Sequence, residues 1–133
     1  MVEQAQALVE QYPSAFIVWN ILGAANKGLG QVDEAVRAFQ KVTELNPTYA
    51  DGFNNLGVAL QEQGKLKEAI VSFNTALSIM PDYAEAFNNR GNALKRQSKL
   101  DEALVAYNKA ITLKPDYASA FNRVEGYCLI VSH

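Results

Sequence analysis

The stretch FNNLGVAL at residues 53–60 returns as FNNRGNAL at residues 87–94, which is 34 positions later. The two units that contain these stretches, residues 50–83 and 84–117, share 18 identical residues of 34. The same period aligns four aromatic residues, Trp19, Phe53, Phe87 and Phe121, and four prolines, Pro13, Pro47, Pro81 and Pro115. A fixed period of this length is typical of proteins whose repeats stack on one another. We therefore interpret the chain as a series of stacked repeats.

Each repeat contains two stretches in which apolar residues recur at helical spacing. In the second repeat, Leu56 and Leu60 lie on one stripe of a first helix, and Ala69 and Phe73 lie on one stripe of a second helix. Glycine favours a turn and proline ends a helix. Turns are therefore predicted at the position that follows each first helix, Gly30, Gly64 and Ser98, and near each proline.

The paired stripes predict an all-α fold, an α-solenoid of seven or eight antiparallel helices wound as a right-handed superhelix. The expected organisation is a half repeat at residues 1–15, three full repeats at residues 16–117 and a half repeat at residues 118–133. Gly57 and Gly91 on the first helices, together with alanines on the second helices, are expected to let each helix pair pack closely, with aromatic residues filling the remaining gaps. Candidate N-cap residues follow the prolines: Ser14, Thr48, Asp82 and Asp116.

At these residues the sequence resembles the tetratricopeptide repeat family. The family pattern is an aromatic residue, Leu-Gly, a later alanine, a second aromatic residue, another alanine and a closing proline. The second repeat carries it as Phe53, Leu56, Gly57, Ala69, Phe73, Ala76 and Pro81, and the first as Trp19, Leu22, Gly23, Ala35, Phe39 and Pro47. In the third repeat, Arg90 replaces the leucine of the pattern and Ser98 replaces the turn glycine. In the first repeat, Asn26 weakens the match to the pattern. The resemblance covers residues 16–117.

The resemblance implies a binding module without enzymatic activity, whose first helices line a concave groove that holds a segment of another protein. Residues roughly 100° round each first helix from the packing stripe are expected to face this groove. The predicted groove residues are Asn20, Lys27, Asp51, Asn54, Gln61, Glu62, Asn88, Asn92, Lys95, Arg96 and Asn122. We expect a protein or peptide partner, bound with modest salt dependence because the groove charges are of mixed sign.

One asparagine recurs in every repeat, as Asn20, Asn54, Asn88 and Asn122. Asparagine costs about half a kcal/mol against alanine inside a helix, so this register indicates a compensating interaction or inheritance by duplication. We interpret Asn54 and Asn88 as a ladder of amides that bonds a ligand backbone. For Asn55 and Asn89, nearer the seam between repeats, a hydrogen bond within the fold is favoured over ligand binding. The resemblance implies a similar ladder in family members that carry substrate to an N-acetylglucosamine transferase, at the register of Asn55 and Asn89.

Family members that hold the carboxyl terminus of chaperones use two lysines, two asparagines and an arginine spread over three repeats. Aligned on the first repeat, those positions hold Asn20, Ala24, Asn55, Glu85 and Asn89; aligned one repeat later, they hold Asn54, Val58, Asn89, Ser119 and Arg123. Both lysines are absent in either alignment. A carboxylate clamp is therefore not expected.

Composition and charge are those of an ordinary soluble domain, with 49% hydrophobic residues, 20% charged residues and a net charge of −2. We expect no nucleic-acid binding, because no basic patch is present, and no membrane span, because no apolar run approaches transmembrane length. The single histidine is the last residue, His133, and the single cysteine, Cys128, sits in an apolar stretch, so no catalytic group, metal site or cofactor is predicted. The sequence starts without a secretory signal, and a cytoplasmic setting is expected.

Two other functions are considered besides that of a binding module. One is an arm or fragment of a larger enzyme such as a glycosyltransferase, which the half repeats at both ends favour. The other is a self-assembling structural role. Residues 118–133 are expected to form a first helix without its second helix, which leaves an apolar surface suited to a homodimer. The expected self-association residues are Tyr127, Leu129, Ile130 and Val131.

Overall fold

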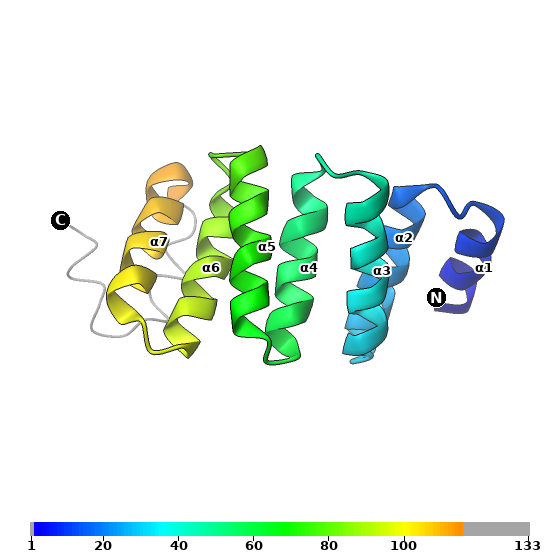
Figure 1. Cartoon of the computed structure of the whole chain (residues 1–133), viewed down its shortest axis with the longest axis horizontal. Helices are drawn as coiled ribbons and strands as arrows, with labels where there is room; N and C mark the ends of the chain where they lie inside the picture. Colours follow the sequence, from blue (N-terminus) through cyan, green and yellow to red (C-terminus); the bar gives the residue numbers. More distant parts are fainter. Residues whose placement is uncertain (1, 116–133) are drawn as a thin grey trace.

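The computed structural model describes residues 2–115, which form seven helices joined by short turns (Figure 1). The helices are α1 (Val2–Gln11), α2 (Phe16–Gly28), α3 (Val32–Leu45), α4 (Ala50–Glu62), α5 (Leu66–Ile79), α6 (Ala84–Arg96) and α7 (Leu100–Leu113). They follow one another in chain order along the long axis of the molecule, from α1 at one end to α7 at the other. The predicted all-α arrangement of stacked helix pairs is confirmed.

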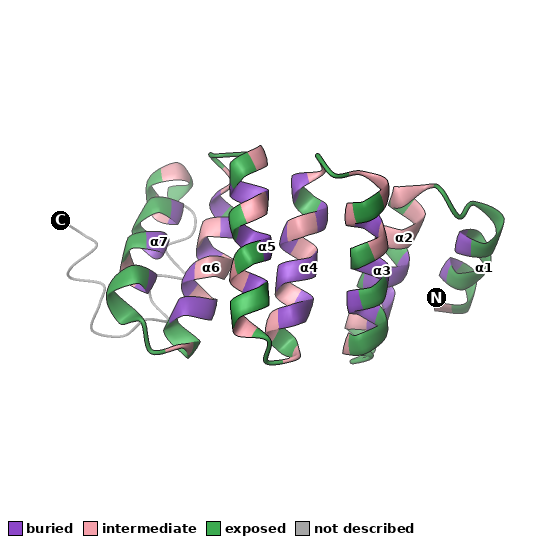
Figure 2. Cartoon of the chain, in the orientation of Figure 1, coloured by how far each residue is buried: buried purple, intermediate pink, exposed green. Residues whose placement is uncertain are grey.

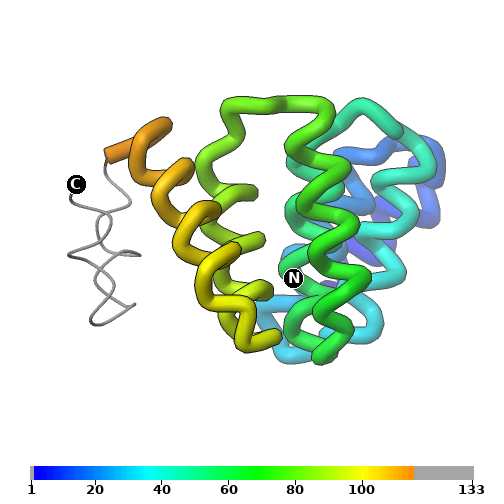
Figure 3. Tube along the Cα trace, turned by 60° about the vertical axis from the view of Figure 1, so that its left-hand side comes forward, coloured from blue at the N-terminus to red at the C-terminus, as the bar shows by residue number. Residues whose placement is uncertain are grey.

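The helices alternate between two roles. The first helices are α2, α4 and α6, and the second helices are α3, α5 and α7, each of which runs back along the first helix of its own repeat (Figure 3). Helix α1 packs on α2 in the way that α3 packs on α4, so it takes the place of a second helix in a half repeat. The three pairs lie within the predicted range of the three full repeats.

The contact between the two helices of each repeat is an aromatic ring seated on a glycine. A methyl group at Gly57 of α4 would lie 2.5 Å from Cε1 of Phe73 on α5. A methyl group at Gly23 would lie 2.6 Å from Cε1 of Phe39, and one at Gly91 would lie 2.8 Å from Cε1 of Tyr107. Because non-bonded carbon atoms prefer separations of roughly 3.5–4.0 Å, no side chain fits at these glycines. The predicted close approach of the helix pairs is confirmed.

Adjacent repeats share an apolar core at the seam between them. Val36 and Phe39 of α3 pack with Leu56 and Leu60 of α4, and these side chains are almost fully buried. Figure 2 shows the buried residues along the helix faces that meet neighbouring helices. Burying one such side chain stabilises a fold by about 1.5–3 kcal/mol, so these contacts stabilise the junction of the first and second repeats.

Each first helix is followed, two positions after its last residue, by a residue with left-handed backbone. The φ angles are 78° at Gly30 and 82° at Gly64, and the N–H of Lys65 donates to the carbonyl of Leu60 at 3.0 Å, as in a Schellman motif. The third repeat places Ser98 at the same position with φ of 64°. This conformation is uncommon for residues other than glycine. The three predicted turns are confirmed, and the last of them is strained.

The predicted N-caps are wrong. The first helices are preceded by Ala15, Tyr49 and Tyr83, one residue after the predicted caps Ser14, Thr48 and Asp82, and none of these N-caps makes a side-chain capping bond. Each predicted cap instead occupies the third position of a turn with proline at the second. For example, the N–H of Tyr83 donates to the carbonyl of Met80 at 3.2 Å. Proline and short polar residues are common at these positions of a turn. Asp116 lies outside the described residues.

Replacing Ser98 with glycine is expected to raise the free energy of unfolding by about 0.5–1 kcal/mol. The left-handed conformation costs roughly 1–2 kcal/mol for an L-residue, and the greater freedom of glycine in the unfolded chain offsets part of that gain. Urea denaturation measures the change. Ser98→Ala is the matched control and should bring no gain, because alanine keeps the steric cost. Equal stability of the two variants would contradict the strain.

Candidate functional site

The first helices α2, α4 and α6 present one continuous face, and α4 contacts α6 directly. We define the groove face by four positions on each first helix, at spacings of four, three and four residues. These positions are Ile17, Ile21, Ala24 and Gly28 on α2; Asp51, Asn55, Val58 and Glu62 on α4; and Glu85, Asn89, Asn92 and Arg96 on α6. All are exposed or half-buried. Because residues at this spacing share one side of a helix, they form three stripes that lie beside one another.

An open hollow of about 410 Å³ lies on this face between α2 and α4. Ala24 and Gly28 line it from α2, and Asn55 and Glu62 line it from α4, together with Lys27 and Phe39. Gly28 has no atom within 4 Å of the place where a Cβ would be, so the small residues of α2 keep the hollow open. The groove face therefore has room for a ligand at this seam.

Pairs of asparagine side chains join the first helices of successive repeats. Asn55 Nδ2 donates to Asn20 Oδ1 at 3.1 Å, and Asn89 Nδ2 donates to Asn54 Oδ1 at 3.0 Å. In each pair the acceptor precedes the donor by 35 residues. The repeated geometry fixes the donor amides on the groove face, because each has one N–H directed at the preceding helix. Their Oδ1 atoms make no hydrogen bond to another described residue.

Charged residues follow the same spacing. Lys27 Nζ lies 4.0 Å from Glu62 Oε1, and Arg96 Nη1 donates to the backbone oxygen of Gln61 at 2.9 Å. Each pair again spans 35 residues and links one first helix to the next. These polar contacts thus connect successive repeats rather than turns of one helix. Four predicted groove residues, Lys27, Gln61, Glu62 and Arg96, are brought together here.

Two tyrosines that precede first helices also link repeats. The ring of Tyr49 packs against Phe16 with centroids 4.9 Å apart, and the hydroxyl of Tyr83 donates to Asp51 Oδ1. Burial, followed by the hydrogen bond to Asp51, raises the pKa of the Tyr83 phenol. Asp51 is a predicted groove residue, and this bond fixes its carboxylate at the start of α4.

The predicted placement of Asn54 and Asn88 is wrong. Both were expected on the open groove, but they are buried, with 1% and 9% of their surface exposed. Asn54 faces the seam with the next repeat, where it accepts the hydrogen bond from Asn89. Asn88 Oδ1 is buried without a hydrogen-bond partner among the described residues. The half-buried register, Asn55 and Asn89, is the one that reaches the groove face.

The other predicted groove residues are found on the first helices. Asn20 is half-buried and accepts from Asn55, Asn92 Oδ1 accepts from the Tyr107 hydroxyl, and Lys95 is exposed. Asn122 and the predicted self-association residues, Tyr127, Leu129, Ile130 and Val131, lie outside the described residues. The self-association through that part of the chain stays a prediction.

The list of predicted groove residues left out the apolar end of the groove face. Ile17 and Ile21 of α2 are exposed by 49% and 40%, and Ala24 is exposed beside them. Ile21 occupies the position that holds Asn55 and Asn89 in the later repeats. The isoleucine at this asparagine position is the sequence feature that could have indicated the apolar end. The groove face therefore changes from apolar on α2 to mainly polar on α4 and α6.

Among residues 2–115, the histidine, cysteine, aspartate and glutamate side chains form no group of three that could hold a metal ion. None of the described helices has both the length and the apolar character that a membrane crossing needs. The groove face offers amides, carboxylates, cations and aliphatic side chains.

The chain belongs to the tetratricopeptide repeat family. Residues 84–117 match the family described as tetratricopeptide repeat, and residues 23–64 and 61–98 match the family described as TPR repeat. Domains built from these repeats are generally protein–protein interaction modules and are typically non-catalytic. The comparison with curated proteins finds no match to this sequence.

Solved structures with similar folds include two of MamA. The crystal structure of MamA is 27% identical with a TM-score of 0.80, and the match covers 89% of this chain and 69% of that chain. The MamA AMB-1 structure is 29% identical with a TM-score of 0.78, covering 86% and 68%. The first TPR of Spaghetti (RPAP3), bound to the HSP90 peptide SRMEEVD, is 24% identical with a TM-score of 0.80, covering 89% and 94%. At 24% identity, the similarity to the Spaghetti (RPAP3) domain shows only that the two chains share a fold.

Asn54→Ala is expected to lower the free energy of unfolding by about 1–3 kcal/mol relative to Asn108→Ala. The change removes the acceptor of the Asn89 amide at a buried position, where an unsatisfied polar group is costly. Asn108 is exposed on α7, so the control carries the same gain in helix propensity without the lost bond. Urea denaturation of both variants measures the difference. Equal stabilities would show that the seam bond contributes nothing.

Proposed function

We propose that this chain is a non-enzymatic interaction module that holds an extended peptide along its groove face. The observation that carries the proposal is the pair of oriented amides, Asn55 and Asn89, at equivalent positions of successive repeats. A side-chain amide has two N–H donors and an oxygen acceptor. The seam bond uses one donor, so each residue keeps one N–H and its Oδ1 for a ligand.

The spacing of these amides suits the backbone of an extended peptide. First helices of adjacent repeats are separated by about 10 Å, which matches three peptide residues at about 3.3 Å each. One amide can therefore bond every third residue of the peptide, accepting from its N–H and donating to its carbonyl. Such contacts favour an extended backbone without requiring a particular side chain.

Sequence preference is expected to come from the two ends of the groove face. Ile17 and Ile21 are exposed at the α2 end, where an apolar peptide side chain would remove them from water. The α6 end carries Glu85 and Arg96, which are of opposite charge. We therefore expect a peptide with one aliphatic or aromatic residue for the α2 end and mixed polar residues beyond it.

The peptide SRMEEVD is not expected to bind this groove. It is bound by the first TPR of Spaghetti (RPAP3), but here both lysines of the family's carboxylate clamp are absent in either alignment, and the alignment on the first repeat puts Asn20 and Glu85 at their positions. Glu85 is exposed in the first turn of α6 and would repel a terminal carboxylate. This peptide therefore serves as a negative control.

The test begins with a display selection of random 12-residue peptides on the wild-type protein. Calorimetry then compares the affinity of one selected peptide for the wild type, for Asn55→Ala/Asn89→Ala and for the matched outer-surface control Asn108→Ala. We expect the double variant to bind about 1–3 kcal/mol more weakly, because two net hydrogen bonds contribute roughly 0.5–1.5 kcal/mol each. The control should bind as the wild type does.

Circular dichroism at the titration temperature must show that all three proteins are folded. Unchanged affinity of the double variant would contradict the role of the amides. Tight binding of SRMEEVD would instead assign the groove to carboxyl-terminal peptides.

A further inference from the structure

Arg90 occupies a position that is part of the apolar core in the other repeats. The equivalent residues, Leu22 and Leu56, are only 4% and 8% exposed. At roughly 100° per residue, Arg90 lies about 130° round α6 from the groove stripe that contains Asn89. Its side chain therefore leaves α6 on the side away from the groove face. A charged side chain has replaced a core leucine at one seam of the stack.

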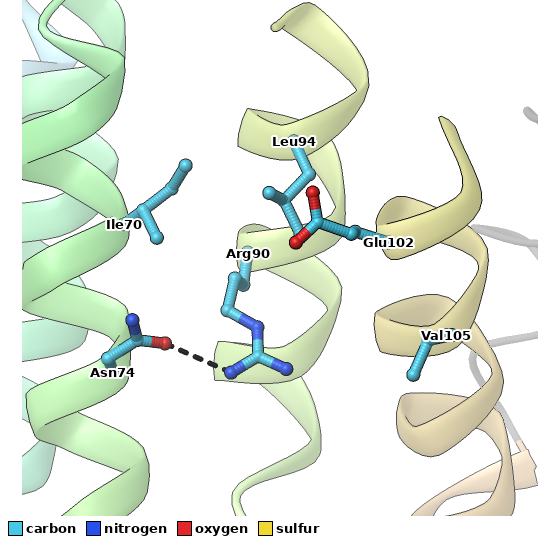
Figure 4. Close-up of a pocket in the computed structure, with 6 residues that line it drawn as sticks. All are labelled: Ile70, Asn74, Arg90, Leu94, Glu102 and Val105. Atoms are coloured by element: carbon cyan, nitrogen blue, oxygen red, sulfur yellow. Dashed lines mark hydrogen bonds between the residues drawn. The ribbon is translucent and has the colours of Figure 1, made fainter. Parts of the chain in front are cut away.

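A pocket of about 330 Å³ surrounds this side chain (Figure 4). Helix α5 contributes Ile70 and Asn74, helix α7 contributes Glu102 and Val105, and Leu94 lies beside Arg90 on α6. Figure 4 shows the guanidinium between α5 and α7, with Glu102 on the opposite wall. We call this the Arg90 pocket. The pocket contains one cation and has apolar side chains at its rim. One of these, Val105, is 67% exposed.

The contacts of the Arg90 guanidinium are neutral. Arg90 Nη1 donates to Asn74 Oδ1 at 2.9 Å, and the guanidinium carbon lies 5.2 Å from the centre of the Phe87 ring. Arg90 is in none of the ion pairs formed among residues 2–115, although Glu102 stands across the pocket. Arginine has five N–H donors in a fork that fits a carboxylate, so most of its donor capacity remains.

Partial burial makes this cation costly for the fold. Burial lowers the pKa of the Arg90 guanidinium, and the charge of Glu102 acts in the opposite direction. A buried charge destabilises a protein unless a counter-ion pairs with it. Leucine would fill the same position at no such cost, as Leu56 does. Residues that break a local rule of the fold in this way are often found at functional sites.

The first repeat also has a polar residue in place of a core leucine, and a hollow lies beside it. Asn26 takes the place of Leu60 and Leu94, is 4% exposed, and lines a smaller hollow of about 170 Å³ beside α1. In the second repeat both leucines, Leu56 and Leu60, are kept, and both belong to a buried apolar cluster. The two hollows thus occur where one core leucine has become polar.

We propose that the Arg90 pocket binds an aspartate or glutamate side chain of a protein partner, on the side of the molecule opposite the groove. The carboxylate accepts two hydrogen bonds from the free N–H groups of the guanidinium, and an adjacent aliphatic side chain of the partner packs on Ile70 and Val105. Charge complementarity identifies the occupant, because the pocket offers a half-buried cation whose direct contacts are neutral. This site does not depend on the proposed groove function.

The test uses acetyl-Leu-Glu-Leu-amide and, as its neutral counterpart, acetyl-Leu-Gln-Leu-amide. NMR follows the Nε–Hε resonance of Arg90 and the methyl resonances of Ile70 and Val105 while each peptide is added up to 10 mM. We expect the glutamate peptide to shift all three and to bind at least fivefold more tightly than the glutamine peptide. Absence of shifts, or equal affinities, would overturn the proposal.

Variants separate the pocket from general charge effects. Arg90→Leu should abolish binding and raise the melting temperature, whereas the matched control Arg37→Leu, on the exposed side of α3, should leave binding unchanged. Glu102→Gln should strengthen binding two- to fivefold, because it removes the opposing carboxylate. Retained binding in Arg90→Leu would overturn the proposal.

Two further measurements exclude other occupants. Inorganic phosphate that shifts the Arg90 resonance as strongly as the glutamate peptide would show a general anion site and overturn the choice of an acidic side chain. Sedimentation equilibrium of the wild type and Arg90→Leu tests the pocket as a contact between copies. A dimer that is lost in Arg90→Leu would assign the pocket to a second copy of this chain and overturn the proposal as stated. Asn55→Ala/Asn89→Ala, which alters the groove, is expected to bind the glutamate peptide normally.

Discussion

The seating of an aromatic ring on a glycine within each repeat is the contact on which the other features depend. Phe73 approaches Gly57 so closely that no side chain fits at that glycine, and Phe39 and Tyr107 repeat the contact in the neighbouring repeats. This contact sets the separation and rotation of the two helices in every pair. Because the pairs are alike, the stack places equivalent residues of successive first helices side by side.

That repetition gives the two surfaces of the stack different chemistry. On the groove face, bonds between residues 35 apart, such as Asn89 to Asn54, use polar groups to join repeats and leave further polar groups for a ligand. On the other side, the seams are apolar where the leucines are kept and hollow where Arg90 or Asn26 replaces one. A substitution in a repeat protein therefore changes one seam locally, since each repeat contacts mainly its neighbours.

The period and the helical stripes were enough to predict the helix pairs, the turns at Gly64 and Ser98, and the close approach at Gly57. The face of the asparagine pair was not predictable, because Asn54 and Asn55 lie about 100° apart on one helix. Which of them meets the next repeat depends on the rotation between repeats, a tertiary property that periodicity does not contain. The caps were missed for a local reason: Thr48 serves the proline turn before the helix begins.

The central claim is that Asn55 and Asn89 use one side-chain N–H for the fold and keep the other for a ligand. The most direct test is the temperature coefficient of the two Nδ2 protons of each residue by NMR, with and without a peptide selected on the groove. We predict one protected and one solvent-exposed proton in the free protein, with the second becoming protected when peptide binds. Two exposed protons in the free protein, or no change on binding, would contradict the account.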